Sequence, residues 1–436
     1  MRQAYRILPV YTGDISGAAS ALFELGGMTV IHDPSGCNST YNTHDELRWY
    51  DRDSLIFITG LRDVDAIMGN DDKLIHDVLQ AAEEFRPAFI SLTNSPVPWM
   101  NGTDFEGIAS VIEEQTGIPV FYVPSNGMHD YVRGAGLAFE RLADRLVTDP
   151  SAGQFARDLS ADRIEKEASA DSSLKDTAMT YARPSKNRGR INVLGVTPLD
   201  FTLQTYVDDL SARLTNAGWE INSLWAMGES LDRIKNAAGA DLNLVVSSTG
   251  MKAAALLNRR FGIPWTAGCP VDGFEEKLFE AMDRTMADRV NRVAYLPADK
   301  DGGIRENLRS AGAGRTVSKD IRKTAGDRMT LIGEPVTMGS LGAAIKEKHG
   351  IETRIVCPAE DCQGLTGPGD VITRGEEEVL QALRDDKLVL ADPMYEYVCP
   401  ADCRLIRLAH LAFSGRTYRK EFRNLLTASS IDFANV

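Results

Sequence analysis

The chain has 436 residues and a formal net charge of −14, with 62 acidic and 48 basic side chains. This acidic balance argues against a nucleic-acid partner and against an anionic membrane surface. No apolar run reaches membrane-spanning length and the first residues carry no signal-peptide pattern, so we expect a cytoplasmic protein. Six cysteines in a chain of this length are too few for a disulfide framework.

The length exceeds what one hydrophobic core normally serves, so we expect several domains. Strand-like and helix-like segments alternate, which predicts an α/β fold of three Rossmann-like domains, each with a parallel sheet flanked by helices. In the first domain, 1–150, strands are predicted from Met28 and at 55–60, 88–93 and 120–124, with helices at 16–25, 71–85, 104–114 and 131–146. Residues 151–190 are polar and predict a linker.

The second domain is predicted at 191–290, with strands from 191, at 219–225 and at 242–247, and helices at 203–217 and 251–261. A connecting insert is predicted at 291–328. The third domain, 329–436, is predicted to hold strands from 329, at 353–357 and at 387–392, helices at 338–348 and 376–384, the run 404–413 and a C-terminal helix. No P-loop or GxGxxG motif occurs, so we do not expect this chain to hydrolyse a nucleotide.

A polar loop follows each predicted strand of the first domain. In a parallel sheet such loops lie at one edge, so these four should converge. The first of them contains Cys37 after a turn sequence that allows close approach to a ligand. A thiolate there could ligate iron, whereas a lone cysteine is more often a buried thiol. His44, Asp45 and Glu46 follow, and they suit either an acid–base role or the capped start of a helix.

Hydroxyl side chains at Ser247, Ser248 and Thr249 precede the helix predicted from 251. They suit an anion site or, equally, plain helix capping. His410 lies in apolar surroundings, which is more typical of a hydrogen-bonded core histidine than of a ligand.

Two cysteine pairs lie in the third domain, Cys357 with Cys362 and Cys399 with Cys403. Four cysteines at strand ends of one sheet could converge on a metal, but their spacing lacks the usual CxxC geometry. Buried thiols or a redox-labile pair are the alternatives.

Four segments, in order along the chain, resemble the motifs of one family. His32-Asp33-Pro34-Ser35-Gly36-Cys37 matches a His-Gly-x-x-Gly-Cys elbow, and residues 65–74 resemble a Val-Phe-Gly-Gly-x-x-x-Leu helix start. Gly262-Ile263-Pro264-Trp265 resembles a Gly-Ile-Pro segment, and Leu405-Ile406-Arg407-Leu408 a Pro-Leu-Ile-Arg-x-Gly stretch. Over nearly its whole length the chain thereby resembles component 1 of the nitrogenase family, which includes molybdenum–iron-type subunits and relatives in cofactor assembly and tetrapyrrole reduction.

The resemblance implies an iron–sulfur cluster at Cys37, but with departures. Two further cluster cysteines of the family fall on Thr12 and on Asn94 or Ser95, and the cysteine of the active-site cofactor falls on Ser247. The chain therefore cannot supply the usual ligands of either large nitrogenase cluster. A smaller [4Fe–4S] cluster shared at a subunit interface fits better, with Asp33 as an oxygen ligand or simply a turn former.

Cys269 ends a strand near the place where the three domains of family members meet. The resemblance makes it, with Ser247 and Thr249, the candidate contact for a further metallocofactor or a bound tetrapyrrole.

The implied function is that of a catalytic-component subunit of an ATP-dependent reductase, supplied with low-potential electrons by an iron–sulfur ATPase. A paralogous subunit or a second copy would complete the cluster. A cofactor-assembly scaffold and a cluster-free partner subunit are the alternatives.

Overall fold

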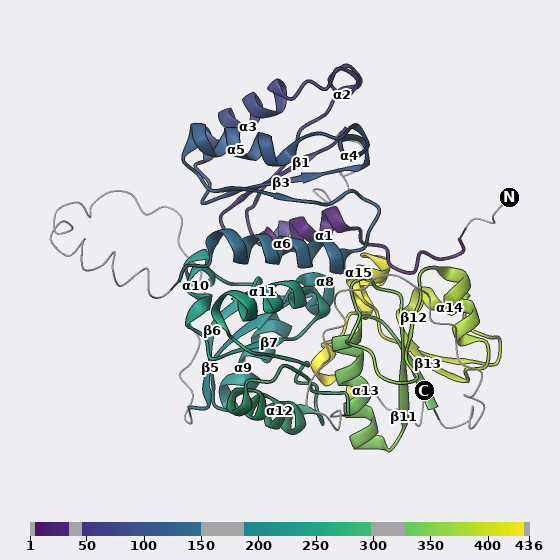
Figure 1. Ribbon diagram of the computed structural model, residues 1–436. Helices are drawn as coiled ribbons and strands as arrows, with labels where there is room; N and C mark the ends of the chain where they lie inside the picture. Colours follow the sequence, from purple (N-terminus) through teal and green to yellow (C-terminus); the bar gives the residue numbers. More distant parts are fainter. Residues whose placement is uncertain (1–4, 35–45, 150–186, 298–327, 431–436) are drawn as a thin grey trace.

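In the computed structural model of the protein, residues 5–34, 46–149, 187–297 and 328–430 are described (Figure 1). They form three parallel sheets covered by helices, which confirms the predicted fold class. Most of the predicted linker and insert lies outside the described residues, as does Cys37.

The first sheet has the strand order β2-β1-β3-β4. Its strands are β1 (Met28–His32), β2 (Leu55–Ile58), β3 (Ile90–Asn94) and β4 (Val120–Val123). Helices α3 (Asp72–Phe85) and α5 (Phe105–Thr116) cover one face, and α1 (Asp14–Leu22) and α6 (Tyr131–Leu146) lie on the other (Figure 1). Both faces are covered, so the central strands β1 and β3 are buried throughout, and the Ser91 hydroxyl donates to the Thr29 hydroxyl at 3.0 Å between them. The connections also contain η2 (Leu47–Tyr50), α2 (Asp63–Met68) and α4 (Pro96–Asn101).

Helix α6 joins the first sheet to the second. It packs against α1 on one side and against α11 (Met251–Phe261) on the other (Figure 1). The crossing with α1 is close at Gly134, where an added Cβ would lie 1.9 Å from the carbonyl oxygen of Asp14. Only glycine allows this approach.

The second sheet has the order β6-β5-β7-β8-β9. Its strands are β5 (Gly189–Leu194), β6 (Trp219–Trp225), β7 (Leu242–Val245), β8 (Trp265–Ala267) and β9 (Arg292–Val293). Its helical segments besides α11 are α8 (Pro198–Phe201), α9 (Gln204–Asn216), α10 (Leu231–Lys235), η3 (Ala237–Gly239), η4 (Ser248–Gly250) and α12 (Glu275–Asp288).

The third sheet has the order β12-β11-β10-β13-β14. Its strands are β10 (Arg328–Ile332), β11 (Glu352–Cys357), β12 (Val371–Ile372), β13 (Leu388–Ala391) and β14 (Arg404–Arg407). Its helical segments are α13 (Pro335–His349), α14 (Glu376–Leu383), η6 (Pro393–Tyr397), α15 (Leu411–Ser414), η7 (Arg419–Glu421) and η8 (Leu425–Ser430). One apolar cluster runs through the second and third units, so they share a core.

Several elements differ from the prediction. Helices α4 and α12 are not among the predicted elements, and the predicted C-terminal helix is, in the described part, a series of short turns ending at η8. Gly415, in a left-handed backbone conformation, ends α15 after one turn. Within the described ranges, no helix has both the length and the apolar character needed to span a bilayer.

Candidate functional site

The loops at the carboxyl edge of the first sheet converge, as the sequence predicts. The backbone N–H of Ser95 donates to the carbonyl of His32 at 3.2 Å, and the Ser125 hydroxyl bonds the backbone of Asn94. On the other side, the ring Nδ1 of His32 lies 2.8 Å from the hydroxyl of Thr59. This edge therefore collects polar groups from all four strands.

Asp33 lies at this edge, directly after β1. It is 1% exposed, and its carbonyl accepts the N–H of Leu61 at 2.9 Å. Among the described residues, neither the Asp33 Oδ2 atom nor the Ser95 hydroxyl has a hydrogen-bond partner. A buried carboxylate oxygen without a donor is costly, so its chemistry fits a cluster iron or another cation beside it.

Glu46 is the described member of the acidic stretch after Cys37, since His44 and Asp45 fall outside the described residues. Its carboxylate accepts hydrogen bonds from the hydroxyl of Ser20 at 2.9 Å and from Nε of Arg48 at 2.8 Å. It also caps η2. Of the two predicted roles of Glu46, acid–base chemistry or the capping of a helix start, its contacts show the capping role.

The three units meet at a buried polar cluster that includes Ser247 and Thr249. The Ser247 hydroxyl donates to Asp200 Oδ2 at 2.6 Å and lies 3.1 Å from the Thr249 hydroxyl. The Tyr131 hydroxyl donates to the other oxygen of Asp200 at 2.7 Å. His410 Nε2 approaches the same oxygen at 3.4 Å, so His410 belongs to this cluster and not only to the apolar core.

A second buried carboxylate, Glu334, stands beside the first. It caps the N-terminus of α13 by accepting the N–H groups of Val336 and Thr337, and it also binds both the N–H and the hydroxyl of Ser248. Burial and the nearby charge of Asp200 raise the pKa of the Glu334 carboxyl. These contacts tie the third unit to the η4 loop of the second.

Asp200, Glu334 and Tyr131 are not among the site residues that the sequence predicts. For Asp200 and Glu334 the sequence does hold an indication, because each of them follows a predicted strand and lies close to a proline. Tyr131 had no such signal, since it opens an ordinary helix and only the packing of α6 against the second unit brings it to Asp200.

Cys269 lies near this cluster but faces apolar surroundings. It is fully buried, and its N–H donates to the Ser340 hydroxyl at 2.8 Å. Burial, reinforced by the charges of Glu334 and Asp200, raises the pKa of the Cys269 thiol well above its usual range. The structure thus places Cys269, Ser247 and Thr249 in one region, and no described contact links them to Asp33.

The described residues at this junction do not fit a metallocofactor. Ligation of a metal by Cys269 would need its thiolate, which burial and the nearby carboxylates disfavour, and the Ser247 hydroxyl is already bonded to Asp200. In the described ranges, no three His, Cys, Asp or Glu side chains are arranged to hold a metal ion.

The two cysteine pairs of the third unit do not converge on one site. Cys357 ends β11 at the carboxyl edge of the sheet, next to Cys362. Cys403 directly precedes β14, whose first residue pairs with the first residue of β13, so it lies at the amino edge. In a parallel sheet these edges are opposite, which rules out the four-cysteine site. Burial raises the pKa of Cys399 to about 12, so an unreactive thiol fits this pair better than a redox role.

A charged bridge connects the units at the start of α6. The Asp130 carboxylate accepts the N–H groups of Val132, at 3.1 Å, and of Glu360, at 2.7 Å. Asp361 of the same loop pairs with Lys252 of α11 at 3.0 Å. The bridge therefore joins the third unit to the other two.

This bridge predicts a pH effect. Burial raises the pKa of Asp130 from 3.8 to about 7, so the folded protein holds its proton after the unfolded chain has released it. The protonated Asp130 side chain contributes to the free energy of unfolding in full below about pH 4, and this contribution is lost as the pH rises to about 7. As the pH rises from about 4 to about 7, the Asp130→Asn variant should therefore lose less stability than the native protein. The midpoints of urea unfolding, measured across this pH range, report the difference. Asp104→Asn, at the exposed cap of α5, is the control and should follow the native protein.

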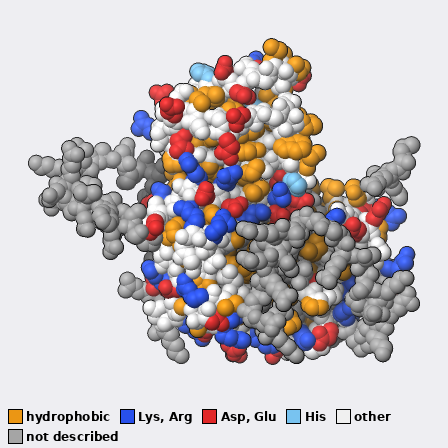
Figure 2. Space-filling model, viewed as in Figure 1, with side chains coloured by type: hydrophobic (Ala, Val, Ile, Leu, Met, Phe, Trp, Pro, Cys, Tyr) orange, Lys and Arg blue, Asp and Glu red, His pale blue; other side chains and the backbone are white. Residues whose placement is uncertain are grey.

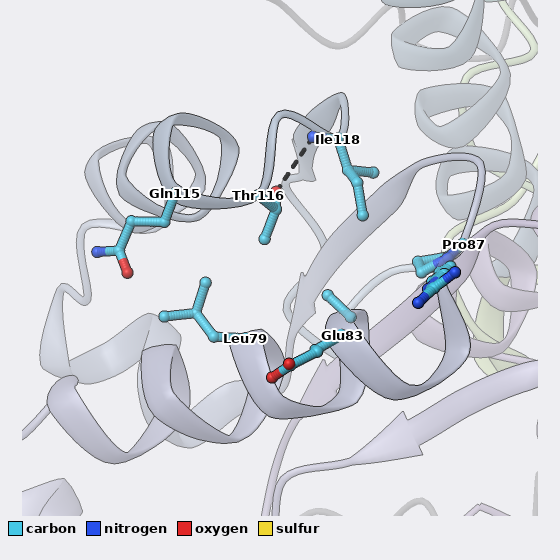
Figure 3. A pocket seen from close by; sticks show the side chains of 8 residues that line it. Leu79, Glu83, Pro87, Gln115, Thr116 and Ile118 are labelled. Atoms are coloured by element: carbon cyan, nitrogen blue, oxygen red, sulfur yellow. Dashed lines mark hydrogen bonds between the residues drawn. The ribbon is translucent and has the colours of Figure 1, made fainter.

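A groove of about 560 Å³ lies at the other end of the first sheet, between the ends of α3 and α5 (Figure 3). Its lining includes Leu79, Glu83, Gln115 and Thr116 (Figure 3). The Thr116 hydroxyl accepts the N–H of Ile118 at 3.2 Å, which satisfies a local turn. None of the predicted site residues contributes to this groove.

Comparison with known proteins places this fold. A family model described as nitrogenase component 1 type oxidoreductase matches residues 14–279. One of the subunits of the light-independent protochlorophyllide reductase of Chlorokybus atmophyticus is 23% identical over 243 residues, which cover 51% of this chain and 46% of the relative. The nitrogenase iron–molybdenum cofactor biosynthesis protein NifE of Klebsiella pneumoniae is 25% identical over 276 residues, which cover 62% of this chain and 53% of the relative.

The solved structure of nitrogenase Cp1 at pH 5 matches with a TM-score of 0.53 and 14% identity, covering 91% of this chain and 82% of the other. At this identity the match shows the fold. The matched stretch spans about half the length of the curated relatives. Since the family model covers more than half of the residues, the chain belongs to the nitrogenase component 1 type oxidoreductase family.

Proposed function

We propose that this chain is a subunit of the catalytic component of a nitrogenase-like, ATP-dependent reductase in the cytoplasm. Low-potential electrons reach it from an iron–sulfur ATPase partner. The observation that carries the proposal is the carboxyl edge of the first sheet. The buried Asp33 Oδ2, four residues before Cys37 in the sequence, has no hydrogen-bond partner among the residues that the structure describes.

A [4Fe–4S] cluster at this edge would supply one-electron relay chemistry at low potential. Cys37 and Asp33 would hold it, together with ligands from a paralogous component 1 subunit or a second copy. The chain itself would position Asp33 directly after β1 and keep water from its carboxylate, which is 1% exposed.

An exposed apolar surface beside this edge supports partner docking. We call it the α2–α4 face; it consists of Val64, Ile67 and Met68 of α2 and Trp99 and Met100 of α4. Ile67 is 83% exposed, and Asn101 Nδ2 donates to the Ala66 carbonyl at 2.9 Å, which holds the two helices together. Figure 2 shows apolar side chains over these helices. Contiguous apolar surface of this kind marks an interaction site.

Ile67→Asp should weaken binding of the reduced ATPase partner by about tenfold or more, because a charge would be buried at the contact. Binding is measured anaerobically by surface plasmon resonance. Leu380→Asp, an exposed apolar residue on α14, is the matched control and should bind normally. Unchanged binding by the Ile67 variant would exclude the α2–α4 face from docking.

The reductase proposal itself is tested with the anaerobically purified complex. Mixing it with the reduced partner and ATP should oxidise the partner's cluster in stopped-flow absorbance, and iron and acid-labile sulfide should accompany the chain. Absence of iron and of ATP-dependent oxidation would contradict the proposal.

The buried junction favours a second candidate function, that of a non-catalytic partner subunit of a nitrogenase-like complex, over that of a cofactor-assembly scaffold. Ser247 and Asp200 bond each other there, and the described residues around them supply no metal site. A neighbouring gene for an ATPase reductase, together with a paralogue richer in cysteine, would favour the reductase.

A further inference from the structure

A basic groove lies along the outer edge of the third sheet, and none of the candidate site residues lines it. Residues 404–423 contain six Lys or Arg and one Glu, in a chain whose net charge is −14. The groove measures about 430 Å³ and runs between β14 and the segment after α15. Its lining residues are Leu405, Ile406, Arg407, Lys420, Glu421, Phe422 and Arg423.

The backbone of β14 is available on the groove side. β14 is the last strand of its sheet in the described part of the chain. The N–H groups of Arg404 and Leu408 donate to β13 and its flank at 2.8 Å, so by strand alternation those of Leu405 and Arg407 point outward. A single bridge between Ala409 and Phe422 closes one end of the groove. An extended chain can therefore add to this edge.

The charges of the groove are only partly balanced within the chain. Arg407 pairs with Glu421 at 3.0 Å, and its guanidinium lies 5.3 Å from the Tyr418 ring. Lys420 and Arg423 are exposed, and no described carboxylate forms an ion pair with them. Two cations therefore remain available to an anionic ligand at the rim.

We propose that this groove binds an extended acidic segment of a partner protein, added as a strand along β14. The uncompensated cations select acidic side chains, and Leu405 and Phe422 offer apolar contact to alternate residues of the added strand. A nucleic acid would meet the repulsion of the acidic chain as a whole. The proposal is independent of the reductase function, because the groove contains none of the cluster or docking residues.

The test uses the full-length protein and a fluorescein-labelled peptide of about eight residues with alternating Glu and Val, a length that spans an ordinary strand. Fluorescence anisotropy should show binding that weakens about tenfold or more in the Lys420→Glu/Arg423→Glu double variant. Arg259→Glu, at an exposed position on α11, is the matched control and should bind as the native protein does.

Two further probes separate strand addition from plain charge attraction. Peptides N-methylated at every odd or every even position should differ, because only one set of N–H groups can face β14. Equal binding by both N-methylated peptides would overturn the proposal. Displacement of the peptide by inorganic phosphate, or by single-stranded oligothymidine of equal charge, would overturn it as well. Such a result would leave the reductase proposal unaffected.

Discussion

Replacing Cys37 by alanine is expected to remove most of the iron from the anaerobically purified complex. Of the three cluster cysteines that the resemblance implies, this chain retains Cys37, and the described edge of the first sheet adds the oxygens of Asp33 and Ser95 that have no hydrogen-bond partner there. An iron–sulfur cluster that loses its thiolate on this chain is left with too few ligands to remain bound. Iron and acid-labile sulfide per subunit, with the visible absorption of the cluster, measure the effect.

The control is a variant in which Cys357, Cys362, Cys399 and Cys403 are serine. These cysteines lie at two opposite edges of the third sheet, so the variant should keep its iron. Full retention of iron by Cys37→Ala would contradict the cluster assignment, and iron loss by the serine variant would move the site to the third unit.

Replacing Glu334 by alanine is expected to destabilise the protein by about 3 kcal/mol, since it leaves buried donors without an acceptor. Glu334 accepts hydrogen bonds from Ser248, Val336 and Thr337 and thereby joins the cap of α13 to the η4 loop. The raised pKa of Glu334 shows that burial opposes its charge, so the net loss is smaller than the sum of the broken bonds. Urea unfolding followed by tryptophan fluorescence measures the change.

Glu347→Ala is the matched control for this prediction. Glu347 lies on the same helix, is exposed and pairs with Lys277 at the surface, so its loss should cost below about 1 kcal/mol. If both variants unfold at the same urea concentration, Glu334 does not hold the two units together.

The alternation of apolar runs and amphipathic stretches was sufficient to predict the three parallel sheets. Helix α6 spans Tyr131–Leu146, the predicted range, because an Asp cap, a regular apolar face and a clear end all agree locally. Short elements such as α4 and β12 were not predicted, because they depend on neighbouring segments more than on their own sequence.

The candidate site, too, was predicted in part from the sequence and decided in part by the tertiary structure. The order of motifs around Cys37 and the polar ends of the strands are written in the sequence, and so is the convergence of the first-sheet loops, because parallel strands place their ends at one edge. That Ser247 is bonded to Asp200, that Glu334 joins two units, and that the four cysteines separate to opposite edges were decided by the tertiary structure. The sequence determines which side chains follow each strand, but the distances between side chains of different sheets are set by how those sheets pack, through contacts such as Gly134 against α1.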